Sequence, residues 1–409
     1  MTAHPIRVVG LGVGAAWLAP PAAAAVAEAD VLVGGRRLLA LFPDHPGARI
    51  PIAGPLEAVC QAMAAAVGEG RVVAVLADGD PLFFGIGRLL AERFGPDSLI
   101  FHPAVTAVAA ACARLGRTWH DLPAVSLHGR DDMGPLFAAL RRAEAVAAYT
   151  DAVTTPGVVA AGLLERGGDA FAMTVCEDMG LPGERLRRLT LAEAAGLEFS
   201  PLNLVLVERV RPVAVPLVFG LSDEALLRQD RVFTKKPVRA ASLAALAPCP
   251  GDVVWDVGAG TGAVALEASL LNAGGPVFAV ERDPERAGLL AENIRRTGAL
   301  TVSAVRGEAP DSLEGLPDPD RVFVGGGTTE RPDLLPRLCE RLKPGGGIVV
   351  NCVLLGSLHR ALADFKAAGL AVTLTQLQAA TAAPLAGDLR LCADNPIYIL
   401  AAAKEAPHG

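Results

Sequence analysis

The fold is decided by residues 253–282, which read VVWDVGAGTGAVALEASLLNAGGPVFAVER. The apolar run 253–257 predicts a buried parallel strand, and a glycine-rich turn follows it directly. The run 263–271 is rich in alanine and leucine and predicts a helix. Residues 276–280 predict a second strand, and Glu281 stands at its carboxyl end. This order of strand, glycine turn, helix, strand and acid indicates a site for a nucleoside ligand.

The glycine turn has the spacing G-x-G-x-G, at Gly258, Gly260 and Gly262, and Asp256 stands two positions before it. Glycines let the backbone turn tightly and let a ligand approach closely, whereas a dinucleotide site would show G-x-G-x-x-G. The stretch resembles motif I of the class I S-adenosylmethionine (SAM) methyltransferases. By that resemblance Asp256 would help to hold the SAM ammonium group, and Glu281 would accept hydrogen bonds from the two ribose hydroxyls. A glycine turn that binds no ligand is the alternative.

The composition argues against several classes of protein. A length of 409 residues predicts two to three domains. No uninterrupted apolar run reaches membrane-spanning length and no signal peptide is visible, so we expect a cytoplasmic protein without a membrane partner. The net charge of −7 argues against a nucleic-acid partner. The seven cysteines and seven histidines are scattered, without a C-x-x-C pair, so we expect reduced thiols and no metal site.

The first half of the chain contains a second glycine turn. The strand-like run 6–11 leads into this turn, and the run 71–76 leads into a G-D-P loop followed by phenylalanines. Together with Thr106-Ala107 and a closing strand at 202–208, these motifs resemble the tetrapyrrole methylase family, the class III SAM methyltransferases. The resemblance implies two α/β lobes with SAM held in the cleft between them.

The same resemblance implies a role for each motif of the first half. The residues that would border SAM come from two loops and are Gly79, Asp80, Phe83, Thr106 and Ala107. The first glycine turn would face the tetrapyrrole with Gly10, Gly12 and Gly14. The chain departs from the family pattern at Val13, where a proline is usual, and at Thr106-Ala107, where a Ser-Ser pair is usual. Asp80 has a second possible role as a turn-forming or helix-capping carboxylate.

We expect two domains joined by a linker. Residues 1–210 would form the tetrapyrrole methylase domain, the proline-containing stretch 211–221 the linker, and residues 222–404 a Rossmann-like class I methyltransferase domain. In the second domain strands and helices alternate up to the sixth strand, which predicts an open, mostly parallel sheet that closes with an antiparallel pair. The seven predicted strands are 253–257, 277–281, 301–305, 321–324, 347–353, 371–377 and 396–401.

Further candidates in the second domain follow its predicted strands. Glu308 would accept a hydrogen bond from the adenine amino group, and Gly325 would leave room for the methyl donor. The full set expected to bind SAM here is Thr234, Asp256, Gly258, Gly260, Thr261, Gly262, Glu281, Glu308, Ala309 and Gly325. The stretch Asp394-Asn395-Pro396-Ile397-Tyr398 resembles the N-P-P-Y motif of amino-methylating enzymes. That motif belongs after the fourth strand and here opens the seventh, so we interpret it as structural.

A class III domain followed by a class I domain resembles the decarboxylating precorrin C5,15-methyltransferase family of cobalamin biosynthesis. The resemblance implies one SAM site per domain, a precorrin as the tetrapyrrole substrate, and a homo-oligomer. The first domain would methylate C5; the second would methylate C15 and decarboxylate the C12 acetate, converting precorrin-6B to precorrin-8. A methyltransferase of a neighbouring corrinoid step and a non-catalytic tetrapyrrole-binding protein are the alternatives.

The substrate of that family carries many carboxylates, which basic side chains would bind. The candidates are Lys235, Lys236 and Arg239, and a solvated basic face is the alternative for each. No residue stands out as a general acid or base, so the catalytic residues stay unassigned.

Overall fold

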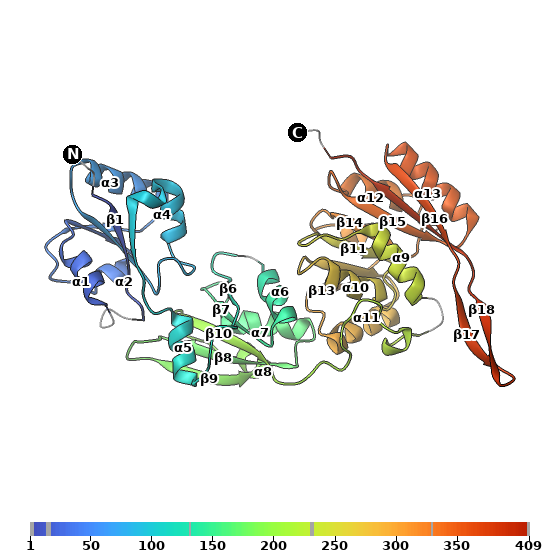
Figure 1. The fold of residues 1–409 in the computed structure, drawn as a ribbon, viewed down its shortest axis with the longest axis horizontal. Helices are drawn as coiled ribbons and strands as arrows, with labels where there is room; N and C mark the ends of the chain where they lie inside the picture. Colours follow the sequence, from blue (N-terminus) through green and yellow to red (C-terminus); the bar gives the residue numbers. More distant parts are fainter. Residues whose placement is uncertain (1–3, 14–17, 131, 230–232, 329, 407–409) are drawn as a thin grey trace.

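The computed structural model describes residues 4–13, 18–130, 132–229, 233–328 and 330–406. Figure 1 shows three successive bodies along the chain, and each is built around its own sheet. Gly14, predicted to face the tetrapyrrole, lies outside the described residues. Among the described helices none is long and apolar enough to cross a membrane.

The first body is a parallel sheet in the order β3-β2-β4-β1-β5. Alternate residues of its strands enter different apolar clusters: Val31 and Val33 pack on one side and Leu32 on the other. A strand buried on both faces in this way is typical of a parallel sheet covered by helices. The elements are β1 (Ile6–Gly10), α1 (Pro20–Ala27), β2 (Val31–Gly34), α2 (Arg36–Leu39), β3 (Ala48–Pro51), α3 (Leu56–Gly68), β4 (Val73–Ala77), α4 (Gly87–Phe94) and β5 (Leu99–His102).

The second body is a mixed sheet in the order β6-β7-β10-β8-β9, in which only the β6–β7 pair is parallel. Helix α5 leads into it from the first body, and its N-terminus is capped by the Thr106 hydroxyl, which accepts a hydrogen bond from Ala109 N at 3.0 Å. The elements are α5 (Ala107–Leu115), β6 (Ala124–Ser126), α6 (Gly134–Arg142), β7 (Ala145–Tyr149), α7 (Pro156–Glu165), β8 (Phe171–Glu177), β9 (Arg185–Thr190), α8 (Leu191–Ala195) and β10 (Asn203–Arg209).

The third body contains the predicted seven-stranded sheet, in the order β13-β12-β11-β14-β15-β19-β16. The first five strands are parallel, and β19 runs antiparallel to β15 and β16, which confirms the predicted closing pair. The elements are α9 (Lys236–Leu246), β11 (Val254–Val257), α10 (Ala263–Leu271), β12 (Val277–Glu281), α11 (Pro284–Thr297), β13 (Val302–Arg306), β14 (Arg321–Val324), α12 (Leu334–Arg341), β15 (Gly347–Cys352), α13 (Leu355–Ala367), β16 (Ala371–Leu377) and β19 (Ile397–Ala403).

The sequence did not predict a hairpin that is inserted between the closing strands. It consists of β17 (Ala380–Leu385) and β18 (Asp388–Ala393), which pair only with each other and extend away from the body in Figure 1. Leu385, Leu389 and Leu391 are exposed on it. Its strands pack against no sheet face, so the alternation of buried and exposed positions that reveals a strand in sequence is missing.

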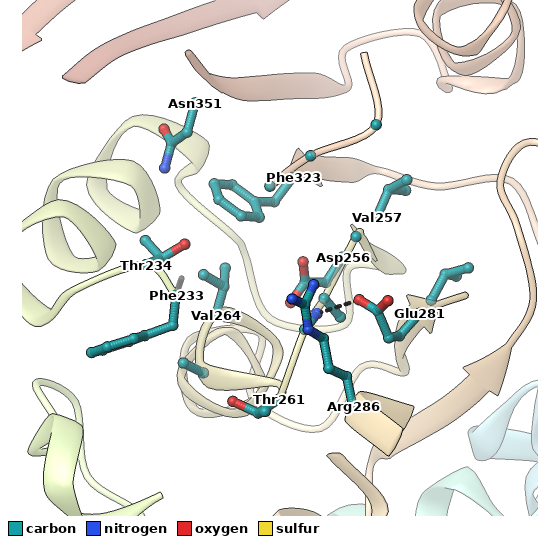
Figure 2. Close-up of a pocket in the computed structure, with 18 of the residues that line it drawn as sticks. Phe233, Thr234, Asp256, Val257, Thr261, Val264, Glu281, Arg286, Phe323 and Asn351 are labelled. Carbon is teal, nitrogen blue, oxygen red and sulfur yellow. Dashed lines mark hydrogen bonds between the residues drawn. The ribbon is translucent and has the colours of Figure 1, made fainter. Parts of the chain in front are cut away.

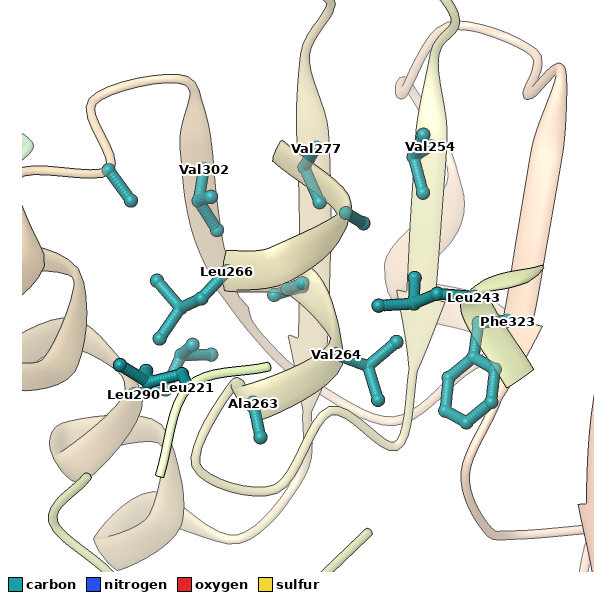
Figure 3. Close-up of a cluster of buried hydrophobic side chains, with 14 of the residues drawn as sticks. Leu221, Leu243, Val254, Ala263, Val264, Leu266, Val277, Leu290, Val302 and Phe323 are labelled. Carbon is teal, nitrogen blue, oxygen red and sulfur yellow. The ribbon is translucent and has the colours of Figure 1, made fainter. Parts of the chain in front are cut away.

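Helix α10 forms the centre of one core (Figure 3). Its Val264 and Leu266 pack with Val254 and Val277 from the adjoining strands and with Leu290 from α11. The helix is apolar apart from Glu267 and Ser269, and both are buried because α10 is enclosed between the sheet and α9. This packing places the glycine turn at the carboxyl edge of the sheet.

Candidate functional site

A cavity of about 590 Å³ opens at the carboxyl ends of β11, β12 and β14, where ligands of open parallel sheets bind (Figure 2). It collects residues that the sequence places as much as 164 positions apart, from Phe233 to Ile397. The predicted residues that line it are Thr234, Lys235, Asp256, Gly258, Gly260, Thr261, Glu281, Glu308, Ala309 and Gly325.

Glu281 fixes the shape of the glycine turn. Its Oε2 accepts a hydrogen bond from Gly260 N at 2.8 Å, and its Oε1 accepts one from Asp283 N at 2.9 Å. The side chain is almost fully buried, and Asp283 in turn caps α11 by accepting from two backbone N–H groups. Each carboxylate oxygen keeps a second acceptor site, so the rigid carboxylate can also accept from a ligand's hydroxyls.

Asp256 lies at the floor of the cavity with one oxygen unsatisfied. Its Oδ2 accepts a hydrogen bond from Ala265 N at 2.9 Å, whereas its buried Oδ1 has no partner among the described residues. Burial raises the pKa of Asp256 to about 7, and the nearby charge of Glu281 adds to the shift. A buried acceptor without a donor is costly unless a ligand or water supplies one. The site therefore fits a ligand that brings an N–H donor, such as an ammonium group.

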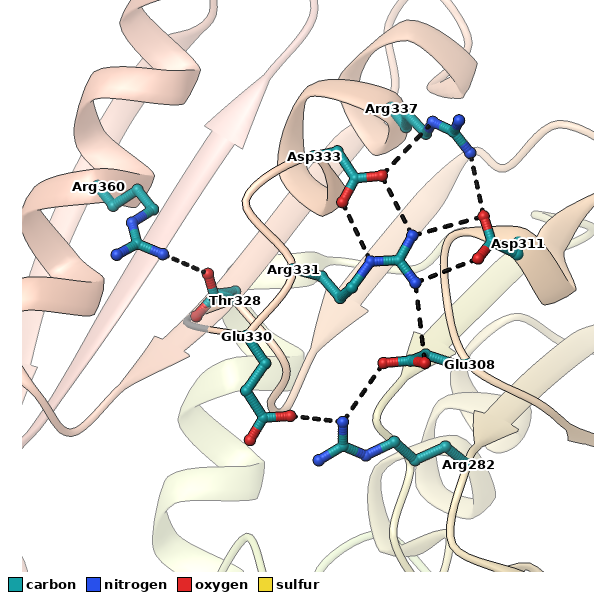
Figure 4. A network of polar contacts seen from close by, with 9 residues as sticks. All are labelled: Arg282, Glu308, Asp311, Thr328, Glu330, Arg331, Asp333, Arg337 and Arg360. Carbon is teal, nitrogen blue, oxygen red and sulfur yellow. Dashed lines mark hydrogen bonds and ion pairs between the residues drawn. The ribbon is translucent and has the colours of Figure 1, made fainter.

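Glu308 is held at the rim of the cavity by arginines (Figure 4). Arg282 Nη1 lies 3.4 Å and Arg331 Nη1 lies 3.8 Å from its carboxylate. Arg331 also pairs with Asp311 and Asp333, at 3.1 Å and 3.2 Å. These groups are substantially exposed, so each pair adds little stability, but the network orients Glu308 toward the cavity.

Gly262 is required for packing, and it does not line the cavity. Its φ is +90°, and a Cβ at this position would lie 2.3 Å from Leu290 Cδ1. Glycine is therefore needed here for the backbone angle at the start of α10, and a contact of Gly262 with SAM stays a prediction. Gly258 has a φ of +73° and faces Gly326 N, which a Cβ would approach to 3.1 Å.

The structure contradicts the prediction that Arg239 binds substrate. The side chain is fully buried, and its Nε donates to Glu267, also fully buried, at 2.7 Å. Its Nη1 donates to Asp223 at 3.0 Å and to the Thr234 carbonyl at 2.8 Å. With no surface exposed, Arg239 cannot reach a ligand carboxylate.

The two lysines of the predicted basic cluster diverge. Lys236 is the first residue of α9, is exposed, and does not line the cavity; its side chain extends toward Gly220. Its role in substrate binding stays a prediction. Lys235 lines the cavity and forms an ion pair with Asp394.

Several lining residues escaped the sequence analysis. Asp394 and Asn395, which we interpreted as structural, both line the cavity. Asn351 does too, and it exchanges hydrogen bonds with Ser242. The only signal for Asn351 was a polar residue in the otherwise apolar strand β15. Figure 2 shows Arg286 reaching over the glycine turn from the first turn of α11.

Between the first and second bodies, Gly10 and Thr106 line a second cavity of about 370 Å³, together with Ala104, Val105 and Trp119. The glycine turn closes onto the G-D-P loop. Gly12 and Gly79 exchange backbone hydrogen bonds at 3.2 Å and 3.1 Å. A Cβ on Gly10 would lie 2.7 Å from Gly79 O, so glycine is required at that position by the loop itself.

Asp80 ties this loop together, which agrees with the turn-forming alternative. One carboxylate oxygen accepts from Leu82 N at 2.9 Å, and the other accepts from Ala104 N at 3.0 Å. Phe83 packs edge-on toward Tyr149 of the second body, with ring centroids 6.3 Å apart. Gly79, Asp80, Phe83 and Ala107 do not line the 370 Å³ cavity, so its walls contain only Thr106 of the five residues expected to border SAM.

Two family models match the chain. The model described as tetrapyrrole (corrin/porphyrin) methylases matches residues 5–195, and the model described as a precorrin methyltransferase domain matches residues 225–404. A Sinorhizobium protein named precorrin-6Y C(5,15)-methyltransferase [decarboxylating] is 34% identical over 93% of this chain and 92% of its own length. The chain belongs to the precorrin-6Y C(5,15)-methyltransferase (decarboxylating) family.

Shorter relatives of this methyltransferase family match about half of the chain. Salmonella typhimurium cobalt-precorrin-7 C(5)-methyltransferase is 36% identical over 46% of this chain and 91% of its own length. Cobalt-precorrin-6B C(15)-methyltransferase (decarboxylating) of the same organism is 35% identical over 46% of this chain and 98% of its own length. Membership in the family makes the chain a methyltransferase that acts with decarboxylation in cobalamin biosynthesis.

Proposed function

We propose that the chain methylates precorrin-6B at C5 and C15 with SAM as donor and removes the carboxyl group of the C12 acetate, giving precorrin-8. The observation that carries the proposal is the 590 Å³ cavity, where the unpartnered Asp256 oxygen and the fixed Glu281 carboxylate lie on adjacent strands. The matching relatives are named for the same two methylations and the decarboxylation.

In the second domain we assign three carboxylates to SAM. Asp256 would accept a hydrogen bond from its ammonium group, Glu281 from its ribose hydroxyls, and Glu308 from its adenine amino group. Bound SAM supplies an electrophilic methyl group. The residues of the chain then serve to align this methyl with a nucleophilic meso carbon and to exclude water. The location of Asp256 at the cavity floor and of Glu308 at its rim supports this orientation.

Lys235 is the side chain we assign to a substrate carboxylate in this domain. Lys235 lies at the cavity and is paired with Asp394, so an incoming substrate carboxylate would compete with Asp394 for the ammonium group of Lys235. Loss of the acetate carboxyl as CO₂ leaves an electron pair that the conjugated macrocycle accepts. The chain's own contribution would be to hold that carboxyl group apart from water, with the breaking C–C bond perpendicular to the ring plane so that the ring can accept the electron pair.

We assign the C5 methylation and a second SAM site to the first domain. The cavity lined by Gly10 and Thr106, and the match of this region to the tetrapyrrole methylases, support that assignment. We place the domain boundaries at residues 210 and 222, which lie between the second and third sheets. We further propose a cytoplasmic homo-oligomer, and the exposed leucines of the β17–β18 hairpin support a contact between copies.

Mass spectrometry of precorrin-6B incubated with the full chain and SAM tests this function. We expect a product that has gained two methyl groups and lost one CO₂. A methyltransferase of a neighbouring corrinoid step would add a methyl without loss of CO₂, and a tetrapyrrole-binding protein would leave the mass unchanged. Either result would contradict the proposal.

A variant separates the two sites. Glu281→Ala disables the SAM site of the second domain, so we expect this variant to add at most one methyl and to retain the acetate carboxyl. Glu330→Ala is the matched control. Glu330 is an exposed acid that pairs with Arg282, and without Glu330 the Arg282 side chain still pairs with Glu308. The control variant should give the same product as the unchanged chain.

A further inference from the structure

The second and third bodies are packed directly against each other. Leu300, which follows α11, is fully buried in the apolar cluster of the second body. Arg166 Nη1 of that body donates to the Leu300 carbonyl at 3.1 Å. Nearby, Gly274 of the third body lies against α6 of the second, so closely that a Cβ on Gly274 would be 2.7 Å from Ala138 Cβ. The junction is therefore a close protein contact with a defined geometry.

Beside this contact lies a cavity of about 540 Å³ with walls from both bodies and the chain between them. It is bounded at one side by Thr297 and Gly298, at the C-terminal end of α11. The first turn of the same helix carries Arg286, which lines the 590 Å³ cavity. A 14-residue helix is about 21 Å long, so the junction cavity is separate from that SAM site.

The walls of the junction cavity carry an excess of positive charge. Three arginines, Arg141, Arg209 and Arg211, line it together with a single carboxylate, Glu144. Glu144 is largely exposed and lies 3.3 Å from Arg209 Nε. Arg211 is paired with Asp169 at 3.1 Å. Arg141 and Arg209 together carry more N–H donors than Glu144 can satisfy.

Two of those donors are buried without an acceptor. Arg141 Nε and Arg209 Nη1 have no hydrogen-bond partner among the described residues. The Arg209 side chain is only 13% exposed, and its guanidinium lies 4.4 Å from the centre of the Phe171 ring, which holds it in place. Burial lowers the pKa of Arg141, and the charge of Arg142 adds to this. Unpaired buried donors on charged groups are unfavourable, and because these two atoms are enclosed, an anion in the cavity would offset the charge of the two guanidinium groups through their other N–H groups.

We propose that the junction cavity is a binding site for the carboxylate of a polycarboxylated ligand, held by Arg141 and Arg209. Guanidinium groups suit carboxylates because their parallel N–H donors match the two oxygens. The tetrapyrrole acid of the proposed function is one source of such carboxylates, and to that extent this assignment rests on the proposed function. A small free polycarboxylate is the other source of the same chemistry.

Calorimetric titration of the full chain with two probes tests the site. Citrate represents a small polycarboxylate, and uroporphyrin represents a macrocycle with many carboxylates. We expect the unchanged chain to bind at least one probe at this site. Arg141→Gln and Arg209→Gln should each weaken that binding at least tenfold. Arg88→Gln removes one exposed charge of the first body and is the control; it should change the affinity less than twofold.

Binding of uroporphyrin that depends on Arg141 identifies the tetrapyrrole as the source, and dependence confined to citrate identifies a small polycarboxylate. The proposal is overturned if neither probe binds, or if both variants bind as the unchanged chain does, because water alone then satisfies the buried N–H groups. Melting temperatures without probe show whether each variant is folded. If Arg209→Gln does not fold, the affinity of Arg141→Gln for the probes decides the test. The titrations contain no SAM and measure no methyl transfer, so their outcome is separate from that of the proposed function.

Discussion

The pair formed by Arg239 and Glu267 should be a large contributor to the stability of the third body. Both side chains are fully buried, and they link α9 to α10. Glu267 also accepts hydrogen bonds from Gly220 N at 3.1 Å and Leu221 N at 3.0 Å. The pair therefore attaches the segment that enters this body to the helix that follows the glycine turn.

We expect Arg239→Met to lower the free energy of unfolding by about 3 kcal/mol. Removing one partner of a buried ion pair costs about 3–5 kcal/mol, because the other charge is left without compensation. The lower end applies here because Glu267 keeps its two backbone donors. Adding Glu267→Gln removes that charge but keeps an acceptor for only one of the two backbone N–H groups, so we expect the double variant to regain only a small part of the loss.

Urea unfolding followed by tryptophan fluorescence, to which the buried Trp255 contributes beside the two other tryptophans, measures this change, and circular dichroism checks that both probes report the same transition. A loss below about 1 kcal/mol for Arg239→Met, outside the roughly 3–5 kcal/mol of a broken buried pair, would refute the reasoning. So would a double variant less stable than the single one. If Arg239 instead bound substrate, its replacement would raise KM and leave the unfolding midpoint unchanged.

Three further predictions concern the SAM sites and their supports. Glu281→Ala should weaken SAM binding to the second domain by about 1.5–3 kcal/mol, the usual value for hydrogen bonds to a charged group, while Glu330→Ala should not change it in calorimetry. Because the pKa of Asp256 is about 7 in the folded chain and its ordinary value is 3.8, the folded chain holds the proton more tightly, and the free energy of unfolding without ligand should fall as pH rises between these values. SAM affinity should rise over the same pH range as Asp256 ionises, and Asp256→Asn should abolish both pH dependences. Urea unfolding and SAM titration at several pH values measure them. A pH dependence that persists in Asp256→Asn would contradict the role assigned to Asp256. Thr106→Ala removes the cap on Ala109 N and should cost about 1 kcal/mol, whereas Thr106→Ser should retain most of it in thermal unfolding.

The sequence by itself determined the order of strands and helices in the third body, apart from the β17–β18 hairpin, and the edge of the sheet at which the 590 Å³ cavity lies. These features are local: the glycine spacing requires particular backbone angles, and the alternation of apolar segments specifies a parallel sheet. Glu281 could be placed because it ends the strand that pairs directly with the strand before Gly258. The same reasoning predicted the closing antiparallel pair of β16 and β19.

Only the tertiary structure decided what individual polar side chains do. Lys235 reaches the cavity and Arg239 is enclosed, although both stand at the start of α9, because the partner of Arg239 lies 28 positions away on α10. Asp394 reaches the cavity because it lies between the end of β18 and the start of β19, and β19 pairs antiparallel with β15 and so begins at the same edge of the sheet. A residue's type and its neighbours in sequence do not contain this information, since the fate of a charge depends on partners brought to it by the fold.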